Sequence, residues 1–384
     1  MTYLIGTLIL FLVLVTFHEY GHYSVARFFK IKVLKFSIGF GRDLFNWTNK
    51  DGVKFSLSMI PLGGYVAFHD PNDVENYNKL TAEEKKYVLA NRPSFEKALV
   101  ILAGPVFNFI LALFTFSLVG LFLPKESDLV SAKIDKFDDD KLYRVVSVND
   151  NQIKNAQDLE IKLLDLTGLT GEVRIGLFDY ESQESIELVE TVENLKFDQE
   201  QAPSSYFSLS PGIDYPPRIG AIDESGIADL AGLKEGDIIL EVNSNKVFSR
   251  YQTIELLNQY GRQLSLLVNR NDNTVIVNLP SKSEGMSYGI LLAPERNNLL
   301  SSLSFGFNQT IFWIVNIFKF LYKTFTGSMG LDSLSGPVGI TKVAGDTLSQ
   351  GLIPFLLLLA MLNISLGAFN LLPLPMLDGG QLLF

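Results

Sequence analysis

The sequence predicts a polytopic α-helical membrane protein with a large mixed α/β region between two of its spans. Long apolar runs indicate the spans, yet the 384 residues include 42 acidic and 32 basic ones. The mean hydropathy is +0.21, so strongly apolar and strongly charged segments must alternate. A net charge of −10 with dispersed basic residues excludes a typical nucleic-acid-binding surface. Without cysteine, only His, Asp and Glu remain as metal ligands of the usual kinds.

The first predicted span covers residues 1–26 and is apolar from Tyr3 to Phe17. With the residues that follow, it reaches the length of about 20 residues that a helix needs to cross a bilayer. A cleaved signal peptide would need a basic residue before the run and a small-x-small cleavage site after it, and neither is present. We therefore interpret the run as a membrane span.

Two further spans are predicted at residues 98–123 and 350–384. The loop at 27–97 carries 12 basic and 8 acidic residues, whereas 125–298 carries 17 basic and 30 acidic ones. Short loops with excess positive charge favour the cytoplasmic side of a membrane. We therefore expect the loop at 27–97 in the cytoplasm and the long acidic region on the opposite side.

Residues 299–326 form another largely apolar segment, whose polar residues recur along one helical stripe. These polar residues are Ser301, Ser304, Asn308, Asn316, Lys319 and Lys323. The stripe is typical of an amphipathic helix that lies in the membrane interface. A span with a few polar residues fits the pattern nearly as well, and the predicted metal site decides between the two.

The first span contains the pattern His-Glu-x-x-His as "HEYGH", residues 18–22. On a helix His18 and His22 lie one turn apart on one face, so both imidazoles can bind one ion. Glu19 beside them can take a proton from water, and imidazole ligands in a hydrolytic site favour Zn²⁺. Ionisable residues at membrane depth are rare and usually mark function. The alternative is a polar helix end that reaches the cytoplasmic interface.

Two histidines need a third ligand, and Asp378 in "NLLPLPMLDGGQLLF" is the outstanding acid because it also lies in an apolar stretch. Pro373 and Pro375 interrupt a helix before it, and two glycines loosen the backbone after it. Alone, this segment fits a simple turn; together with the two histidines it fits a metal ligand. For Asp378 to reach them, the last span must run in the same direction as the first. Residues 299–326 must then lie in the interface.

A β-hairpin is predicted at about 34–68, with the turn sequence "NKDG". A peptidase cuts extended backbone, whereas a membrane-spanning substrate arrives as a helix. A free strand edge can bind such a substrate as an added strand. We expect Lys54–Met59, and with it Ser56, Leu57 and Ser58, to supply that edge. A surface hairpin without this role is the alternative.

The acidic region is predicted to hold two PDZ domains, at 124–211 and 212–295. Residues Ile219–Val247 contain the turn "GLKEGD" before a strand and a hairpin after it. Residues Tyr143–Ile153 are similar but lack this turn, and a repeat at about ninety residues supports tandem domains. PDZ domains usually bind peptide ends by strand addition.

The sequence resembles the site-2 intramembrane zinc metalloproteases, and within them the bacterial RseP type. The motifs are "HEYGH", "SIGFG" (37–41), "IPLGGYV" (60–66), "AGPVFNF" (103–109), "SGPVGI" (335–340) and "NLLPLPMLDGG" (370–380), in order along nearly the whole chain. The resemblance implies that His18, His22 and Asp378 hold one zinc ion. It also implies that Glu19 is the catalytic base, that Asn370 engages the substrate and that the hairpin dips into the membrane.

The same resemblance implies an intramembrane zinc endopeptidase of the bacterial inner (cytoplasmic) membrane, with the active site toward the cytoplasm and periplasmic PDZ domains. Its expected substrates are single-span proteins of the anti-sigma-factor type, already cleaved once in the periplasm, and remnant signal peptides. In the family the PDZ pair is thought to block substrates with bulky outer domains, so this role and peptide binding both stay open. The family has His where this chain has Gln381, and it continues into a further span, so we expect residues beyond Phe384.

Two other functions fit parts of the pattern. A membrane-anchored PDZ scaffold could carry a structural zinc, but such sites have four protein ligands and the sequence offers three candidates. A zinc transporter would need a second polar stripe to form a path, and the sequence shows one metal motif. Both observations favour the protease.

Overall fold

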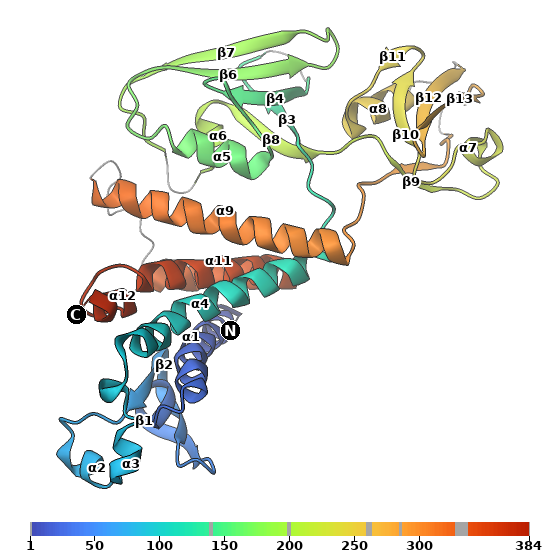
Figure 1. The fold of residues 1–384 in the computed structure, drawn as a ribbon. Helices are drawn as coiled ribbons and strands as arrows, with labels where there is room; N and C mark the ends of the chain where they lie inside the picture. Colours follow the sequence, from blue (N-terminus) through green and yellow to red (C-terminus); the bar gives the residue numbers. More distant parts are fainter. Residues whose placement is uncertain are drawn as a thin grey trace. The chain divides into compact units, whose positions relative to one another are not determined.

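The computed structural model describes residues 2–137, 141–197, 201–258, 263–283, 286–326 and 337–383. The chain forms two compact units, one made of Met1–Phe122 with Asn298–Phe384 and the other of Leu123–Asn297. Long helices and one β-sheet build the first unit, whereas the second is rich in short strands (Figure 1).

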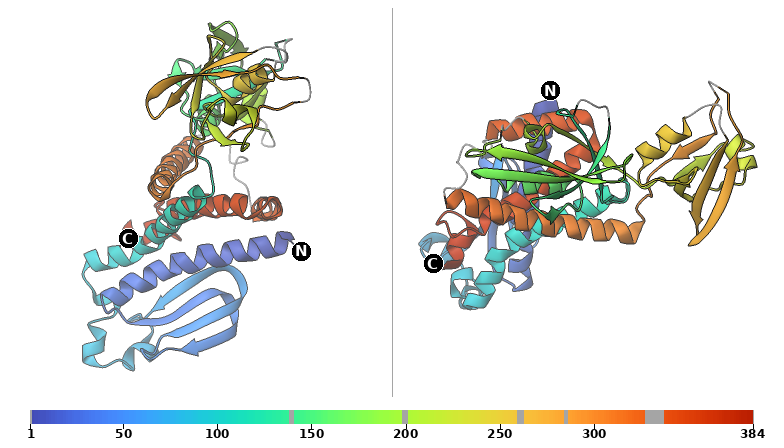
Figure 2. Two further views of the ribbon diagram at one scale, coloured as in Figure 1. Left: turned by 90° about the vertical axis from the view of Figure 1, so that its right-hand side faces the viewer. Right: turned by 90° about the horizontal axis from the view of Figure 1, so that it is seen from above.

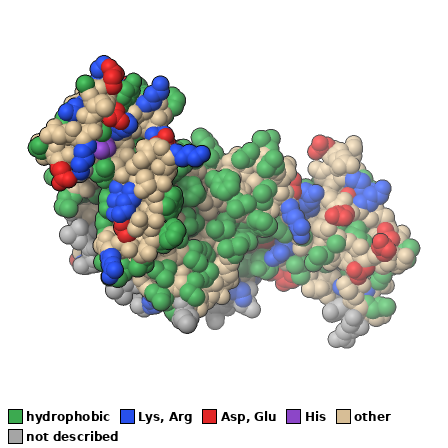
Figure 3. All heavy atoms as spheres, turned by 90° about the horizontal axis from the view of Figure 1, so that it is seen from below, with side chains coloured by type: hydrophobic (Ala, Val, Ile, Leu, Met, Phe, Trp, Pro, Cys, Tyr) green, Lys and Arg blue, Asp and Glu red, His purple; other side chains and the backbone are tan. Residues whose placement is uncertain are grey.

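Three helices in the described part of the chain are long and apolar enough to cross a membrane: α1 (Thr2–Phe28), α4 (Ser94–Gly120) and α11 (Leu352–Asn370). At 1.5 Å per residue, even the shortest approaches the apolar thickness of about 30 Å. The outward side of α1 is apolar, and Figure 3 shows such side chains gathered over a broad area of the surface. The predicted class, a helical membrane protein with a sheet region, is confirmed.

Helix α4 packs against both α1 and α11, and small residues allow the close approach (Figure 2). A Cβ on Gly21 of α1 would lie 2.4 Å from the carbonyl oxygen of Ala103. A Cβ on Gly367 of α11 would lie 2.7 Å from the ring of Phe109. Close van der Waals packing of this kind is what holds helices together in lipid, where burial of apolar surface gives little advantage. Helix α4 is thus fixed between its two neighbours.

Helix α9 (Leu299–Phe325) covers the predicted amphipathic segment and packs on α4 and α11. A Cβ on Gly306 would lie 2.0 Å from Ser117 Oγ, so its backbone lies directly on α4. It is not among the helices apolar enough to span a membrane. After the exposed Leu299 and Leu300 at its start, its exposed large side chains lie three or four residues apart along one stripe, at Leu303, Phe307, Ile311, Val315, Phe318, Tyr322 and Phe325.

Helix α10 (Pro337–Gln350) packs against the N-terminal half of α1, in a segment for which we make no structural prediction from the sequence. The Tyr3 hydroxyl donates a hydrogen bond to Asp346 Oδ1 at 2.7 Å. At 14 residues the helix is about 21 Å long, too short to cross the apolar core. It therefore supports α1 from the side without being a further span.

The sheet of the first unit is formed by β1 (Val33–Thr48) and β2 (Lys54–Phe68), and it lies against α1 (Figure 2). Gly39 and Gly41 both have φ of +87°, which glycine adopts without strain, and they mark a bend in β1. Both strands bend, so the sheet has four segments in the order 43–48, 54–58, 35–38 and 64–68. Short elements follow at α2 (Val74–Asn78), α3 (Ala82–Lys85) and the 3₁₀ turn Leu89–Asn91.

One face of this sheet is apolar and packs on residues near the C-terminal end of α1. The Tyr23 ring lies edge-on to Phe36 and Phe55, with ring centroids 5.7 and 5.5 Å apart. The other face carries polar side chains, among them the buried Ser37, Ser56 and Ser58. One face of the sheet therefore packs on α1, and the opposite face does not.

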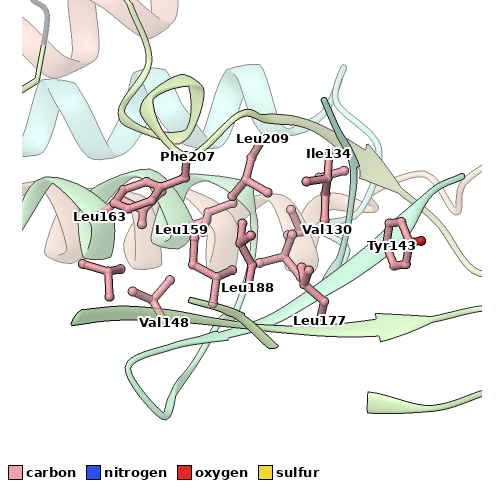
Figure 4. Close-up of a cluster of buried hydrophobic side chains, with 14 of the residues drawn as sticks. Val130, Ile134, Tyr143, Val148, Leu159, Leu163, Leu177, Leu188, Phe207 and Leu209 are labelled. Carbon is pink, nitrogen blue, oxygen red and sulfur yellow. The ribbon is translucent and has the colours of Figure 1, made fainter. Parts of the chain in front are cut away.

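The first core of the second unit is enclosed by a six-stranded sheet and two helices. These are β3 (Leu129–Ile134), β4 (Tyr143–Val148), β5 (Asn151–Gln152), α5 (Ala156–Leu164), β6 (Gly171–Asp179), β7 (Ser185–Val192), α6 (Pro203–Tyr206) and β8 (Leu209–Asp214). The order is β7-β6-β4-β3-β8, with β5 beside β4. Leu159 and Leu163 of α5 pack with Phe207 in this core (Figure 4). Because β8 completes the sheet, this region extends to Asp214, beyond the predicted boundary at residue 211.

The second core of this unit has its own strands and helices. These are β9 (Ile219–Ile222), α7 (Ile227–Leu230), β10 (Ile238–Val242), β11 (Asn245–Lys246), α8 (Arg250–Leu257), β12 (Leu264–Arg270), β13 (Asn273–Leu279) and β14 (Ile290–Leu292). The sheet order is β11-β10-β12-β13, and β9 pairs with β14. Asp237, at the end of the turn "GLKEGD", is buried and accepts hydrogen bonds from Arg270 at 2.8 and 2.6 Å. This pair ties the turn to β12.

Candidate metal centre

Side chains from early and late in the chain meet at one point of the first unit. His18 and His22 come from α1, and Asp378 is the first residue of α12 (Asp378–Leu383). Asp378 Oδ2 lies 3.2 Å from His18 Nε2 and 3.5 Å from His22 Nε2, and the two Nε2 atoms lie 3.3 Å apart. Among the described residues, this is the cluster of His, Asp and Glu whose ligand atoms could hold a metal ion.

The donor atoms of this cluster fit a zinc ion. His22 Nδ1 lies 2.8 Å from the carbonyl oxygen of Val100, which can only accept, so Nδ1 carries the ring proton and Nε2 keeps its lone pair. Asp378 Oδ2 is buried and has no hydrogen-bond partner in the described structure. A nitrogen lone pair and a carboxylate oxygen repel each other unless a cation lies between them, and zinc takes these two ligand types.

Asp378 reaches the histidines because the chain turns sharply after α11. Helix α11 ends at Asn370, and the proline-containing segment 371–377 leads to Asp378, so the predicted helix break is present. A Cβ on Gly379 would lie 2.4 Å from the carbonyl oxygen of Leu371. The two glycines therefore allow the start of α12 to fold back onto this turn. Asn370 itself lies close to the cluster, with its Nδ2 atom 3.4 Å from His18 Nε2.

Glu19 is buried beside the two histidines, with 8% of its surface exposed. The backbone N–H of Val66 in β2 lies near its carboxylate. Gly64 lies next to it, because a Cβ there would be 2.9 Å from Glu19 Cγ. The outer sheet segment 64–68 therefore lies directly against this glutamate.

The predicted substrate-binding strand occupies a different position from the one expected. Segment 54–58 is paired on both sides, with 43–48 and with 35–38, so it is an inner strand. Ser56 Oγ donates to Ser37 Oγ at 3.0 Å, and the Ser37 and Ser58 hydroxyls lie 3.2 Å apart. Leu57 is the exposed member of the predicted trio.

The expectation that Lys54–Met59 forms a free edge is therefore wrong. Its cause is the bending of β1 and β2, which places segments 35–38 and 64–68 beside 54–58, on the side away from 43–48. Among the described residues, the outer edges of this sheet are formed by 43–48 and 64–68. The edge that lies beside Glu19 is 64–68.

Two residues of α4 also belong to the site. A Cβ on Gly104 would lie 2.3 Å from His22 Nε2 and 2.7 Å from His18 Cε1. Asn108 is fully buried, and its amide nitrogen lies 3.1 Å from His18 Nδ1. Their spacing of four residues in "AGPVFNF" puts them on one face of a helix, and this was the available signal in the sequence.

We expect Gly104→Ala to lower both zinc content and proteolysis, the latter by at least about 100-fold, because the new methyl group would occupy the position of the ligand nitrogens. Zinc per protein and initial cleavage rates measure the two effects. Gly212→Ala in β8 is the matched control, since its nearest neighbour would be 3.9 Å away. Full zinc content in Gly104→Ala would contradict the packing described for α4.

The comparisons with known proteins agree with this site. The chain matches the model of peptidase family M50 over residues 6–384. It is 32% identical to "Regulator of sigma E protease" of Haemophilus influenzae, over 97% of this chain and 87% of the relative. A "Putative zinc metalloprotease" of Vibrio cholerae is 30% identical and "Regulator of sigma-E protease RseP" of Escherichia coli is 28% identical, with the same shares covered. The chain therefore belongs to peptidase family M50, and it is a membrane zinc metalloprotease of the site-2, RseP type.

Proposed function

We propose that the protein cleaves single-span proteins within the bacterial cytoplasmic membrane, with His18, His22 and Asp378 holding its zinc ion. The observation that carries this proposal is the cluster itself: three ligand atoms within 4.8 Å of one another, on and beside an apolar helix, next to a buried glutamate. Three protein ligands leave a position for substrate or water, as catalytic zinc requires, whereas a structural zinc is enclosed by four. This donor set favours the protease over a scaffold.

Zinc, when bound, polarises a peptide carbonyl and makes water more acidic. Glu19 is proposed to accept the proton of the attacking water and to pass it to the leaving amine. Its buried position beside the backbone N–H of Val66 is proposed to hold the carboxylate in place for this transfer. The amide of Asn370, close to His18 Nε2, is proposed to hold a backbone group of the substrate beside the scissile bond.

The substrate is proposed to bind as an added strand on the outer edge of segment 64–68. This edge lies against Glu19, and the backbone N–H of Val66 already points at that carboxylate. A substrate that leaves its helix loses backbone hydrogen bonds, and a strand edge can replace them. The substrate is thus still proposed to bind by strand addition, but at segment 64–68 instead of segment 54–58.

Because the chain contains no cysteine, single introduced cysteines can test this edge. In the Glu19→Gln variant, Tyr65→Cys is expected to form a disulfide with a cysteine placed next to the cleavage site of the substrate. Leu57→Cys is the matched control, since Leu57 is 38% and Tyr65 36% exposed, but Leu57 lies on an inner segment. Equal cross-linking at both positions, or cross-linking at Leu57 alone, would rule out the proposed edge.

The proposed topology places the β1–β2 sheet in the cytoplasm and α9 in the outer interface. It rests on the charge of the loop at 27–97 and on the common direction of α1 and α11, which both lead toward the metal centre. A membrane-impermeant thiol reagent is expected to label Ser349→Cys in intact spheroplasts and Lys50→Cys only after lysis. Labelling of Ser349→Cys only after lysis would contradict this arrangement.

The two β-rich regions of the second unit are proposed to be periplasmic PDZ domains. Each has a separate core, and the turn "GLKEGD" in the second is held by the buried Asp237–Arg270 pair. Two roles fit PDZ domains on the periplasmic side: blocking of substrates with bulky outer domains, and binding of peptide ends.

The substrates proposed are anti-sigma-factor-type proteins trimmed once outside the membrane, and remnant signal peptides. Two relatives, those of Haemophilus influenzae and Escherichia coli, are named as regulator of sigma E proteases, which supports the first of these classes.

A further inference from the structure

Helix α4 supplies no metal ligand, yet three of its residues face the two imidazoles. Val100, Gly104 and Asn108 are spaced by four residues and so form one stripe of the helix. The carbonyl oxygen of Val100 lies 2.8 Å from His22 Nδ1, and the amide of Asn108 lies 3.1 Å from His18 Nδ1. Gly104 leaves the space between them free for the rings. Each ring nitrogen that points away from Asp378 therefore has a partner on α4.

The partner of His18 must be an acceptor if this histidine is to bind zinc through Nε2. A neutral imidazole carries one proton, so a free lone pair on Nε2 requires the proton on Nδ1, and an N–H can only donate. Asn108 offers an acceptor in Oδ1, which is buried and has no hydrogen-bond partner in the described structure. Rotation of the amide by 180° exchanges Oδ1 and Nδ2 without changing the shape of the side chain.

We propose that Asn108 is a positioning residue of the zinc site, whose Oδ1 accepts the Nδ1–H of His18. This hydrogen bond fixes the ring orientation and the tautomer that leaves Nε2 for the metal, as the Val100 carbonyl does for His22. Partners of this kind orient metal-binding histidines, and their loss typically weakens metal affinity about 10- to 100-fold. The proposal rests on the proposed function, in that His18 must be a zinc ligand.

A purely structural role for Asn108 in helix packing is the alternative, and α11 offers a matched comparison. Asn363 is as fully buried as Asn108, with 0% of its surface exposed. Its Nδ2 donates to the carbonyl oxygen of Leu359, one turn back in its own helix, and its Oδ1 has no partner in the described structure. Substitution of Asn363 therefore removes only a buried amide from the helix bundle, whereas substitution of Asn108 also removes the acceptor beside His18.

The test compares zinc affinity in purified, full-length variants, measured by competition with a chromophoric chelator at fixed pH. We expect Asn108→Leu, which keeps the size but removes the acceptor, to weaken zinc binding about 10- to 100-fold. Asn108→Asp keeps an acceptor and is expected to stay within about threefold of the wild type, since carboxylates commonly fill this role. Asn363→Leu is expected to bind zinc like the wild type. Thermal unfolding of the metal-free proteins reports whether each variant folds.

Each other outcome overturns the proposal. Wild-type affinity in Asn108→Leu would show that His18 needs no acceptor there, and equal losses in Asn108→Leu and Asn363→Leu would indicate packing alone. An Asn108→Asp variant as weak as Asn108→Leu would exclude the hydrogen bond as the cause. The His18→Ala variant distinguishes a failure of the Asn108 proposal from a failure of the proposed function. Unchanged zinc binding in this variant would show that His18 is not a zinc ligand.

Discussion

Glu19→Gln is expected to lower the rate of substrate cleavage by about 10²- to 10⁴-fold while zinc stays bound, the usual range for loss of a general base. Gln has the shape of Glu, and its Oε1 can still face the backbone N–H of Val66, so we expect the surroundings of the site to stay the same. What it cannot do is take a proton from water. The variant therefore separates proton transfer from metal binding.

The measurement uses the reconstituted protein and a single-span substrate truncated on its outer side, with initial rates and zinc content recorded for each variant. Glu75→Gln is the control, since this glutamate lies in the short helix α2, is exposed and pairs with Lys79. It should cleave like the wild type, and a zinc chelator should stop cleavage in both. Cleavage by Glu19→Gln at the wild-type rate, or cleavage that survives the chelator, would remove the protease function from this site.

Asp378→Ala is expected to abolish cleavage together with zinc binding. It takes away the only carboxylate among the three clustered ligand groups and leaves two imidazole nitrogens 3.3 Å apart. Loss of a ligand should cost more affinity than the 10- to 100-fold that is typical when only a partner of a ligand is lost. Zinc per protein should therefore fall below the level found in Asn108→Leu.

Asp70→Ala, in the exposed loop after β2, is the control for Asp378→Ala and should retain both zinc and activity. The zinc content distinguishes the two inactive variants, since we expect Glu19→Gln to keep its zinc and Asp378→Ala to lose it. If Asp378→Ala retained full zinc content, the third ligand would have to be another group, and the geometry around His18 and His22 would need a different explanation.

The sequence contained enough information to predict candidate ligands and a candidate base, but little about what surrounds them. His18, Glu19 and His22 follow from helical spacing, and Asp378 follows from the presence of an acid in an apolar, proline-broken stretch. The partner of His18 depends on how α4 is aligned with α1, which no local pattern encodes. From the sequence alone, Asn108 is a polar residue within an apolar run, without a definite role.

The sheet shows the opposite difficulty. A run such as Lys54–Met59 has the alternation of a strand, and this part of the prediction agrees with β2. Whether a strand is an edge depends on its neighbours, and here the bends in β1 and β2 provide neighbours on both sides. Helix α10 was missed for a related reason, since its sequence has neither the length nor the apolarity of a span and gains its place by packing on α1.

The meeting of His18 and His22 with Asp378 has a consequence for biosynthesis. Helix α1 is made first, whereas the segment around Asp378 is made only after α4, the whole second unit, α9 and α11. With Asp378 as the proposed third ligand, a nascent chain whose first helices are already in the membrane would lack a zinc ligand, and the proposed base Glu19 would have no activated water to act on. We therefore expect the chain to be inactive while it is being synthesised. On this proposal, proteolysis begins only when α12 has been made, which would protect neighbouring membrane proteins from an unfinished chain.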